Sequence, residues 1–135
     1  MSSAPTPRHG QPPRPKYYDL SLAHLPPPGL VSIFHRVSGL LLFFPILPLL
    51  LYALQATLGS EEGFTRWHDL IANRPAVKLI LLGFTWAYAH HFFAGIRYLV
   101  LDLHWGIAKA PARTSAVAVL ILGVLTTVLV AWRIW

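Results

Sequence analysis

The sequence contains no cysteine and few charged residues. Of its 135 residues, 12% are charged and 55% are hydrophobic, whereas ordinary soluble domains carry about 25% charged residues. The lack of cysteine excludes disulfide frameworks, cysteine-ligated iron–sulfur clusters and thiolate catalysis. The scarcity of charge indicates a membrane protein. The net charge of +6 comes from residues scattered around apolar segments, which favours the flanks of membrane spans over a nucleic-acid surface.

The N-terminal region is rich in proline. Residues 1–28 contain eight of the twelve prolines. This region has no continuous apolar stretch followed by a small-residue cleavage site, so it does not have the pattern of a signal peptide. We predict a proline-rich N-terminal segment over residues 1–28 and a membrane-anchor domain over residues 29–135.

Three apolar segments follow, and each is nearly long enough to cross a bilayer. Residues 37–54, 79–96 and 114–132 contain no Asp, Glu, Lys or Arg, and a span needs roughly 20 mostly apolar residues. Backbone groups inside lipid must be paired within the segment, so each span should be helical. The sequence therefore predicts an all-α fold, an up-down-up antiparallel bundle with helices at about 29–55, 75–102 and 113–134. Pro45 and Pro48 predict a kink in the first span.

The two connections differ in character. In the first loop Ser60 precedes Glu61 and Glu62, a pattern that favours the start of a helix, and we expect a short interfacial helix with Trp67 at headgroup level.

The N-terminal segment and the second loop lie on one side of a three-span protein. Basic residues number five on that side and four on the other, which weakly favours a cytoplasmic N-terminus.

Polar side chains occur in two clusters within these apolar segments. The first cluster, residues 32–39, begins the first span, and the second, residues 90–98 followed by Asp102, ends the second span. Antiparallel spans bring the start of one helix and the end of the next to the same membrane face. We therefore predict one shared polar site just inside one leaflet, because isolated polar groups there would be costly.

His91 is the main candidate ligand in this site. His91, Gly95, Tyr98 and Asp102 share one helical stripe, and Gly95 leaves room beside the histidine for a flat ligand such as a porphyrin. Imidazole is a common axial ligand of haem iron. A single membrane histidine more often packs between helices, so the residues alone do not identify haem.

The order of these residues resembles two motifs of the succinate dehydrogenase cytochrome b subunit family. Residues 32–39, Ser-Ile-Phe-His-Arg-Val-Ser-Gly, are similar to S-I-x-H-R-x-[ST]-G. Residues 91–102 are similar to H-x-x-x-G-x-R-H-x-x-x-D, with Tyr98 in place of the second histidine. Arg14-Pro15 is similar to the family's R-P before the first span. The resemblance covers about residues 14–134.

The resemblance implies a membrane-anchor subunit, not itself catalytic, that shares one haem b with a second three-helix anchor. An iron–sulfur subunit and a flavoprotein subunit would bind on the cytoplasmic face, and electrons from succinate would reach ubiquinone in a bacterial inner membrane. Carried over by position, His91 is the haem axial ligand and iron-binding residue. Ser32 and Arg36 would line the quinone site. His35, Arg36 and Arg97 are the candidates for the haem propionates.

Other interpretations remain open. A fumarate reductase anchor would use the same haem-binding and quinone-binding residues, whereas a cofactor-free membrane scaffold would use none of them. A cytochrome b with two haems of its own would need four axial histidines, but the spans contain only His35, His90 and His91. His90 projects about 100° away from His91 on a helix, so both cannot bind one iron. A transporter would favour broken helices or inverted repeats, and neither is visible.

Overall fold

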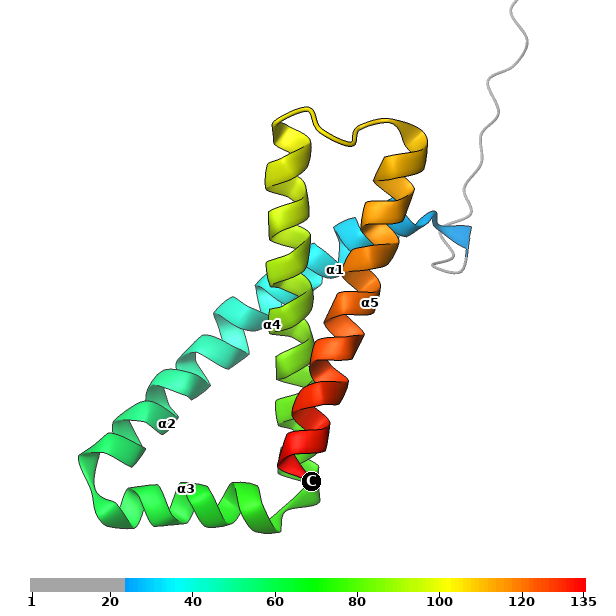
Figure 1. Cartoon of the computed structure of the whole chain (residues 1–135). Helices are drawn as coiled ribbons and strands as arrows, with labels where there is room; N and C mark the ends of the chain where they lie inside the picture. Colours follow the sequence, from blue (N-terminus) through cyan, green and yellow to red (C-terminus); the bar gives the residue numbers. More distant parts are fainter. Residues whose placement is uncertain (1–23) are drawn as a thin grey trace, which may run out of the picture.

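The computed structural model describes residues 24–135, and all regular structure within them is helical. Arg14-Pro15 and most of the proline-rich segment lie outside the described residues. The elements are α1 (Pro27–Leu41), a π-helical segment η2 (Leu42–Ile46), α2 (Leu47–Gly59), α3 (Glu61–Asn73), α4 (Pro75–Asp102) and α5 (Lys109–Ile134). Helices α4 and α5 run side by side, the helix from α1 to α2 crosses them obliquely, and α3 closes one end (Figure 1).

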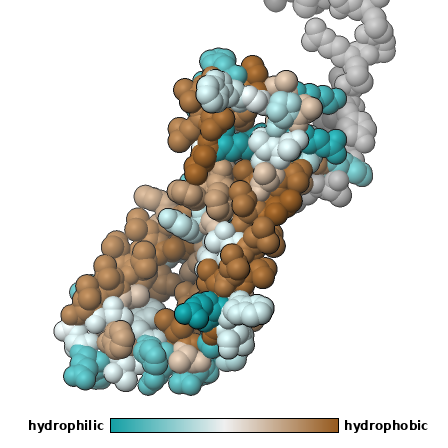
Figure 2. All heavy atoms as spheres, viewed as in Figure 1, coloured by the Kyte–Doolittle hydropathy of each residue, from teal (hydrophilic) through white to brown (hydrophobic). Residues whose placement is uncertain are grey.

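Three helices in the described part are long and apolar enough to cross a membrane, which confirms the predicted all-α fold with three spans. They are Pro27–Gly59, Pro75–Asp102 and Lys109–Ile134. Apolar side chains cover the middle of the molecule and polar side chains gather at its two ends (Figure 2). The first helix begins slightly earlier than predicted, because prolines at its N1 and N2 positions suit a helix start, where no N–H donor is needed.

The disturbance predicted around Pro45 takes the form of a π-helical turn. Pro45 lies inside η2, and the Leu47 N–H donates to the Leu42 carbonyl, five residues back. Proline has no N–H and its ring crowds the preceding turn. A π turn relieves this conflict without ending the helix, and such turns are frequent at functional sites.

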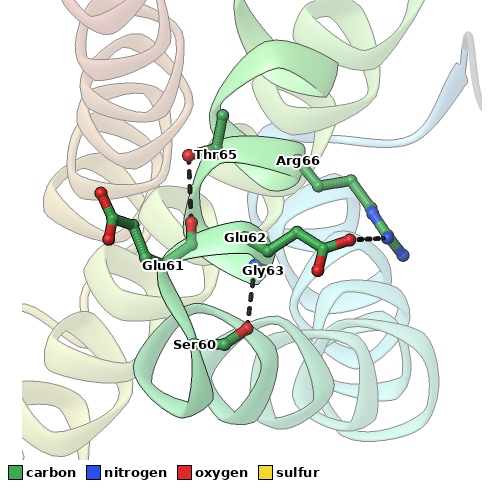
Figure 3. A network of polar contacts seen from close by, with 6 residues as sticks. All are labelled: Ser60, Glu61, Glu62, Gly63, Thr65 and Arg66. Atoms are coloured by element: carbon green, nitrogen blue, oxygen red, sulfur yellow. Dashed lines mark hydrogen bonds and ion pairs between the residues drawn. The ribbon is translucent and has the colours of Figure 1, made fainter.

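The short helix predicted in the first loop is present as α3, and its position at the membrane interface stays a prediction. The Ser60 hydroxyl accepts a hydrogen bond from the Gly63 N–H at 3.0 Å, and Arg66 forms an ion pair with Glu62 at 2.9 Å (Figure 3). Glu61 and Glu62 lie in the first turn, where acids complement the helix dipole. Trp67 packs edge-on against Tyr52 of α2, with ring centroids 6.1 Å apart.

Small residues fill the contact between the spans. Ala87, Ala94 and Ala116 are fully buried, and Gly123 of α5 lies against the backbone of His90 in α4. Helices associate in membranes largely through close packing, which small side chains permit. Helix α4 is therefore held between α1 and α5, and its two faces carry different sets of polar side chains.

Candidate functional site

His91 projects from α4 toward α1 and meets His35. Their rings are stacked, with centroids 4.3 Å apart and planes 16° from parallel. The Tyr98 ring also lies close, with its centroid 5.1 Å from that of His35. The start of the first span and the end of the second therefore meet, as the sequence predicted.

Hydrogen bonds from α1 fix the His91 imidazole. Its Nδ1 lies 3.1 Å from the His35 carbonyl oxygen and 3.2 Å from the Ser38 hydroxyl, which itself donates to the same carbonyl at 3.0 Å. A carbonyl oxygen only accepts hydrogen bonds, so Nδ1 carries the proton in this arrangement. Nε2 then has a free lone pair, which is the form of histidine that binds a metal ion.

Gly39 allows this close approach. A Cβ atom at position 39 would lie 3.0 Å from Cε1 and 3.5 Å from Nδ1 of His91, and the first of these distances is tighter than ordinary van der Waals contact. At Gly95 an added Cβ would meet only the His35 Nε2, at 3.9 Å. Gly39, rather than Gly95, is thus the glycine that accommodates the His91 ring.

An apolar groove of about 400 Å³ opens beside His91. It runs along the π-helical region, and its lining residues are Gly39, Leu42, Phe43, Ile46, Leu47, Leu50, Tyr88 and His91. Phe43 and Leu50 are 65% and 60% exposed, so this wall faces outward from the chain. A flat apolar cofactor that reaches His91 would find two polar side chains, the His91 imidazole and the Tyr88 phenol, among otherwise apolar walls.

His90, about 100° further round α4, points away from the groove and into the packing between the helices. Its side chain is fully buried, stacked on Trp86 with centroids 5.3 Å apart and edge-on to Phe34 at 5.8 Å. Neither ring nitrogen has a hydrogen-bond partner in the described part of the chain. The two adjacent histidines therefore occupy different surroundings, and only His91 lines the groove.

The other predicted site residues are more dispersed. Ser32 is half-buried and Arg36 is exposed on α1, so Arg36 is accessible to a ligand or a neighbouring subunit. Arg97 turns toward α5: its Nε donates to the Ser115 hydroxyl at 3.1 Å and its Nη2 to the Ala112 carbonyl at 3.2 Å. These contacts occupy Nε and Nη2, and the predicted propionate contact of Arg97 stays a prediction. Asp102 is exposed at the end of α4.

The chain matches the family of succinate dehydrogenase/fumarate reductase transmembrane subunits over residues 10–131. It belongs to this family. Similar proteins include the succinate dehydrogenase cytochrome b556 subunit of Coxiella burnetii, 36% identical over 90% of this chain and 97% of the relative. That of Paracoccus denitrificans is 30% identical over 85% and 90% of the two chains. That of Rickettsia felis is 26% identical over 86% and 89%.

Sequence reasoning missed the roles of two residues within this family motif. Ser38 and Gly39 were visible as part of residues 32–39, but only the packed structure reveals that Ser38 holds Nδ1 and that Gly39 admits the ring. The sequence did contain an indication of these roles: Ser38 and Gly39 are two small residues one helical turn beyond His35, and small residues at this spacing favour the close approach of a second helix.

Proposed function

We propose that this chain is a membrane-anchor subunit of a succinate dehydrogenase that holds one haem b through His91. A second anchor subunit supplies the other axial imidazole. An iron–sulfur subunit and a flavoprotein subunit complete the complex and deliver electrons from succinate to ubiquinone. The coarser statement, that the chain is a transmembrane subunit of this family, is already given by the family match. The finer roles rest on the residues of the site.

The observation that carries this proposal is the orientation of the His91 imidazole. Nδ1 is engaged by α1, which leaves Nε2 as the free ligand atom beside an apolar groove. The donor set fits haem, because metal-binding histidines commonly donate their other N–H to a backbone carbonyl. Haem when bound would supply one-electron chemistry, while the chain contributes the ligand atom, its orientation and an apolar wall.

Cationic and hydrogen-bond-donating side chains on α1 are the proposed partners of the haem propionates and of the quinone. His35 stacks on His91, which lines the groove, and Arg36 is exposed one residue further along α1; both are proposed to serve the haem propionates. Ser32 and Arg36 lie one helical turn apart and are proposed to donate hydrogen bonds to the quinone oxygens. A charged donor strengthens such bonds, so Arg36 is proposed to make the larger contribution.

We further propose that the chain lies in a bacterial inner membrane with its N-terminus in the cytoplasm. The bacterial sources of the similar proteins and the slight excess of basic residues on the N-terminal side support this orientation. The iron–sulfur and flavoprotein subunits would then bind on the side that carries the N-terminal segment and the α4–α5 turn. An anchor of a fumarate reductase is the alternative, because it would use the same residues.

The test is an optical spectrum of the purified complex, recorded oxidised and then reduced. We expect the bands of a low-spin b-type haem, with about one haem per copy of this chain. A fully assembled complex that contains all subunits but no haem would contradict the proposal and favour a cofactor-free scaffold. Enzymatic assays of succinate oxidation and fumarate reduction on the same preparation distinguish the two directions.

A further inference from the structure

Arg97 is a buried cation with no acidic partner among residues 24–135. It is only 7% exposed, and no carboxylate of the described chain forms an ion pair with it. Its Nε and Nη2 atoms are held by Ser115 and Ala112 of α5. The Nη1 atom donates to nothing in the described part. Because a cation near hydrocarbon is costly without a counter-charge, an anionic partner is expected.

The guanidinium borders a pocket of about 260 Å³ between the ends of α4 and α5. The other lining residues are Val100, Leu101, Trp105, Gly106, Pro111 and Ser115. Apart from Arg97 and the Ser115 hydroxyl, these side chains are apolar or absent. The pocket therefore combines one cationic group with apolar walls, which matches a ligand that is itself charged at one end and apolar at the other.

The position of the pocket adds positive potential. Through Pro111 it borders the first turn of α5, where the helix dipole favours an anion. Lys109 and Arg113 are exposed in the same part of α5. Trp105, which is 71% exposed, is a residue type that gathers at the membrane–water boundary. A headgroup bound in the pocket would meet Arg97 and Trp105.

We propose that this pocket binds the phosphate group of a membrane phospholipid, with Arg97 donating hydrogen bonds from Nη1. The acyl region then covers Val100 and Trp105, which are 41% and 71% exposed. A free phosphate ion offers the same charge, but it would lose hydration against the apolar walls without gaining apolar contact. A carboxylate from a neighbouring subunit is the competing occupant, and it would leave the exposed apolar walls to be covered by protein.

The first experiment counts phospholipids on the intact purified complex by native mass spectrometry while phosphatidylglycerol is titrated. Arg97→Gln removes the cation. Val100→Trp narrows the pocket and leaves Arg97 in place. Leu99→Trp is the matched control, because Leu99 is 68% exposed but does not line the pocket. After purification we expect both pocket variants to carry one phospholipid fewer than the wild type. In the titration we expect them to bind added phosphatidylglycerol about tenfold more weakly, with the control unchanged in both.

Three results would overturn the proposal. Equal phospholipid counts in the wild type and Val100→Trp would show that the pocket holds no lipid, whether or not Arg97→Gln assembles. Displacement of the lipid by excess inorganic phosphate would indicate a site for a free anion. A benzoylphenylalanine at position 100 separates the remaining occupants: illumination should give phospholipid adducts, whereas adducts to a neighbouring subunit alone would assign the pocket to protein.

Discussion

The Nδ1 atom of His91 lies 3.1 Å from the backbone carbonyl oxygen of His35. One motif histidine therefore orients the other through its main chain, while their rings stack 4.3 Å apart. A main-chain acceptor cannot be removed by a side-chain substitution. The adjustable partner is Ser38, whose hydroxyl is shared between the same carbonyl and the same imidazole.

Ser38→Ala should raise the haem midpoint potential. Loss of an acceptor for the Nδ1–H makes the imidazole a weaker electron donor and so stabilises the oxidised iron less. A neutral hydrogen bond contributes about 0.5–1.5 kcal/mol, which corresponds to a shift of roughly 20–60 mV for one electron. Redox titration of the purified complex measures this shift. Ser32→Ala is the matched control, and an equal shift in both variants would contradict the role given to Ser38.

Gly39→Ala should disturb the haem more than Gly95→Ala does. The added Cβ at position 39 would lie 3.0 Å from His91 Cε1, against 3.9 Å from His35 Nε2 at position 95. Overpacking of this kind costs about 1–3 kcal/mol, whereas alanine in a tolerant helical position is favoured over glycine by about 1 kcal/mol. Haem content and the low-spin electron paramagnetic resonance signal are the measurements. If Gly39→Ala keeps its haem and its low-spin signal while Gly95→Ala loses them, Gly95 rather than Gly39 is the glycine that the haem site requires.

The quinone contacts predict unequal effects of two substitutions. Arg36→Leu removes charged donors worth about 1.5–3 kcal/mol each, and Ser32→Ala removes one neutral donor worth about 0.5–1.5 kcal/mol. We expect quinone reduction to fall further in Arg36→Leu. Succinate oxidation by a dye that accepts electrons upstream should survive in both variants. If dye reduction disappears from an assembled complex, the residues act outside the quinone site.

Much of this architecture follows from the sequence because lipid restricts the choices. The charge-free segments predict the three spans, and Ser60 before two glutamates predicts the start of α3. The side-chain directions were harder to predict. Gly39 of α1 lies against the His91 ring, and the Arg97 side chain turns toward α5. Such directions depend on packing between helices, which one-dimensional periodicity does not contain.

The orientation of the chain makes a separate prediction. With a cytoplasmic N-terminus, a reporter fused after Trp135 should lie on the outer side of the membrane. A reporter inserted at Gly106, in the turn between α4 and α5, should lie in the cytoplasm. Reporters active on opposite sides from these would reverse the proposed orientation, and they would move the proposed subunit-binding face with it.

The most direct test compares His91→Leu with His90→Leu in the purified complex. His91 lines the groove, whereas His90 is enclosed by Trp86 and Phe34 with neither nitrogen paired among the described residues. Leucine at position 91 should therefore abolish the low-spin b-type spectrum or convert it to a high-spin one. Leucine at position 90 should leave the spectrum largely intact, since it replaces unpaired polar atoms by apolar ones. Loss of the spectrum in His90→Leu together with its retention in His91→Leu would contradict the account.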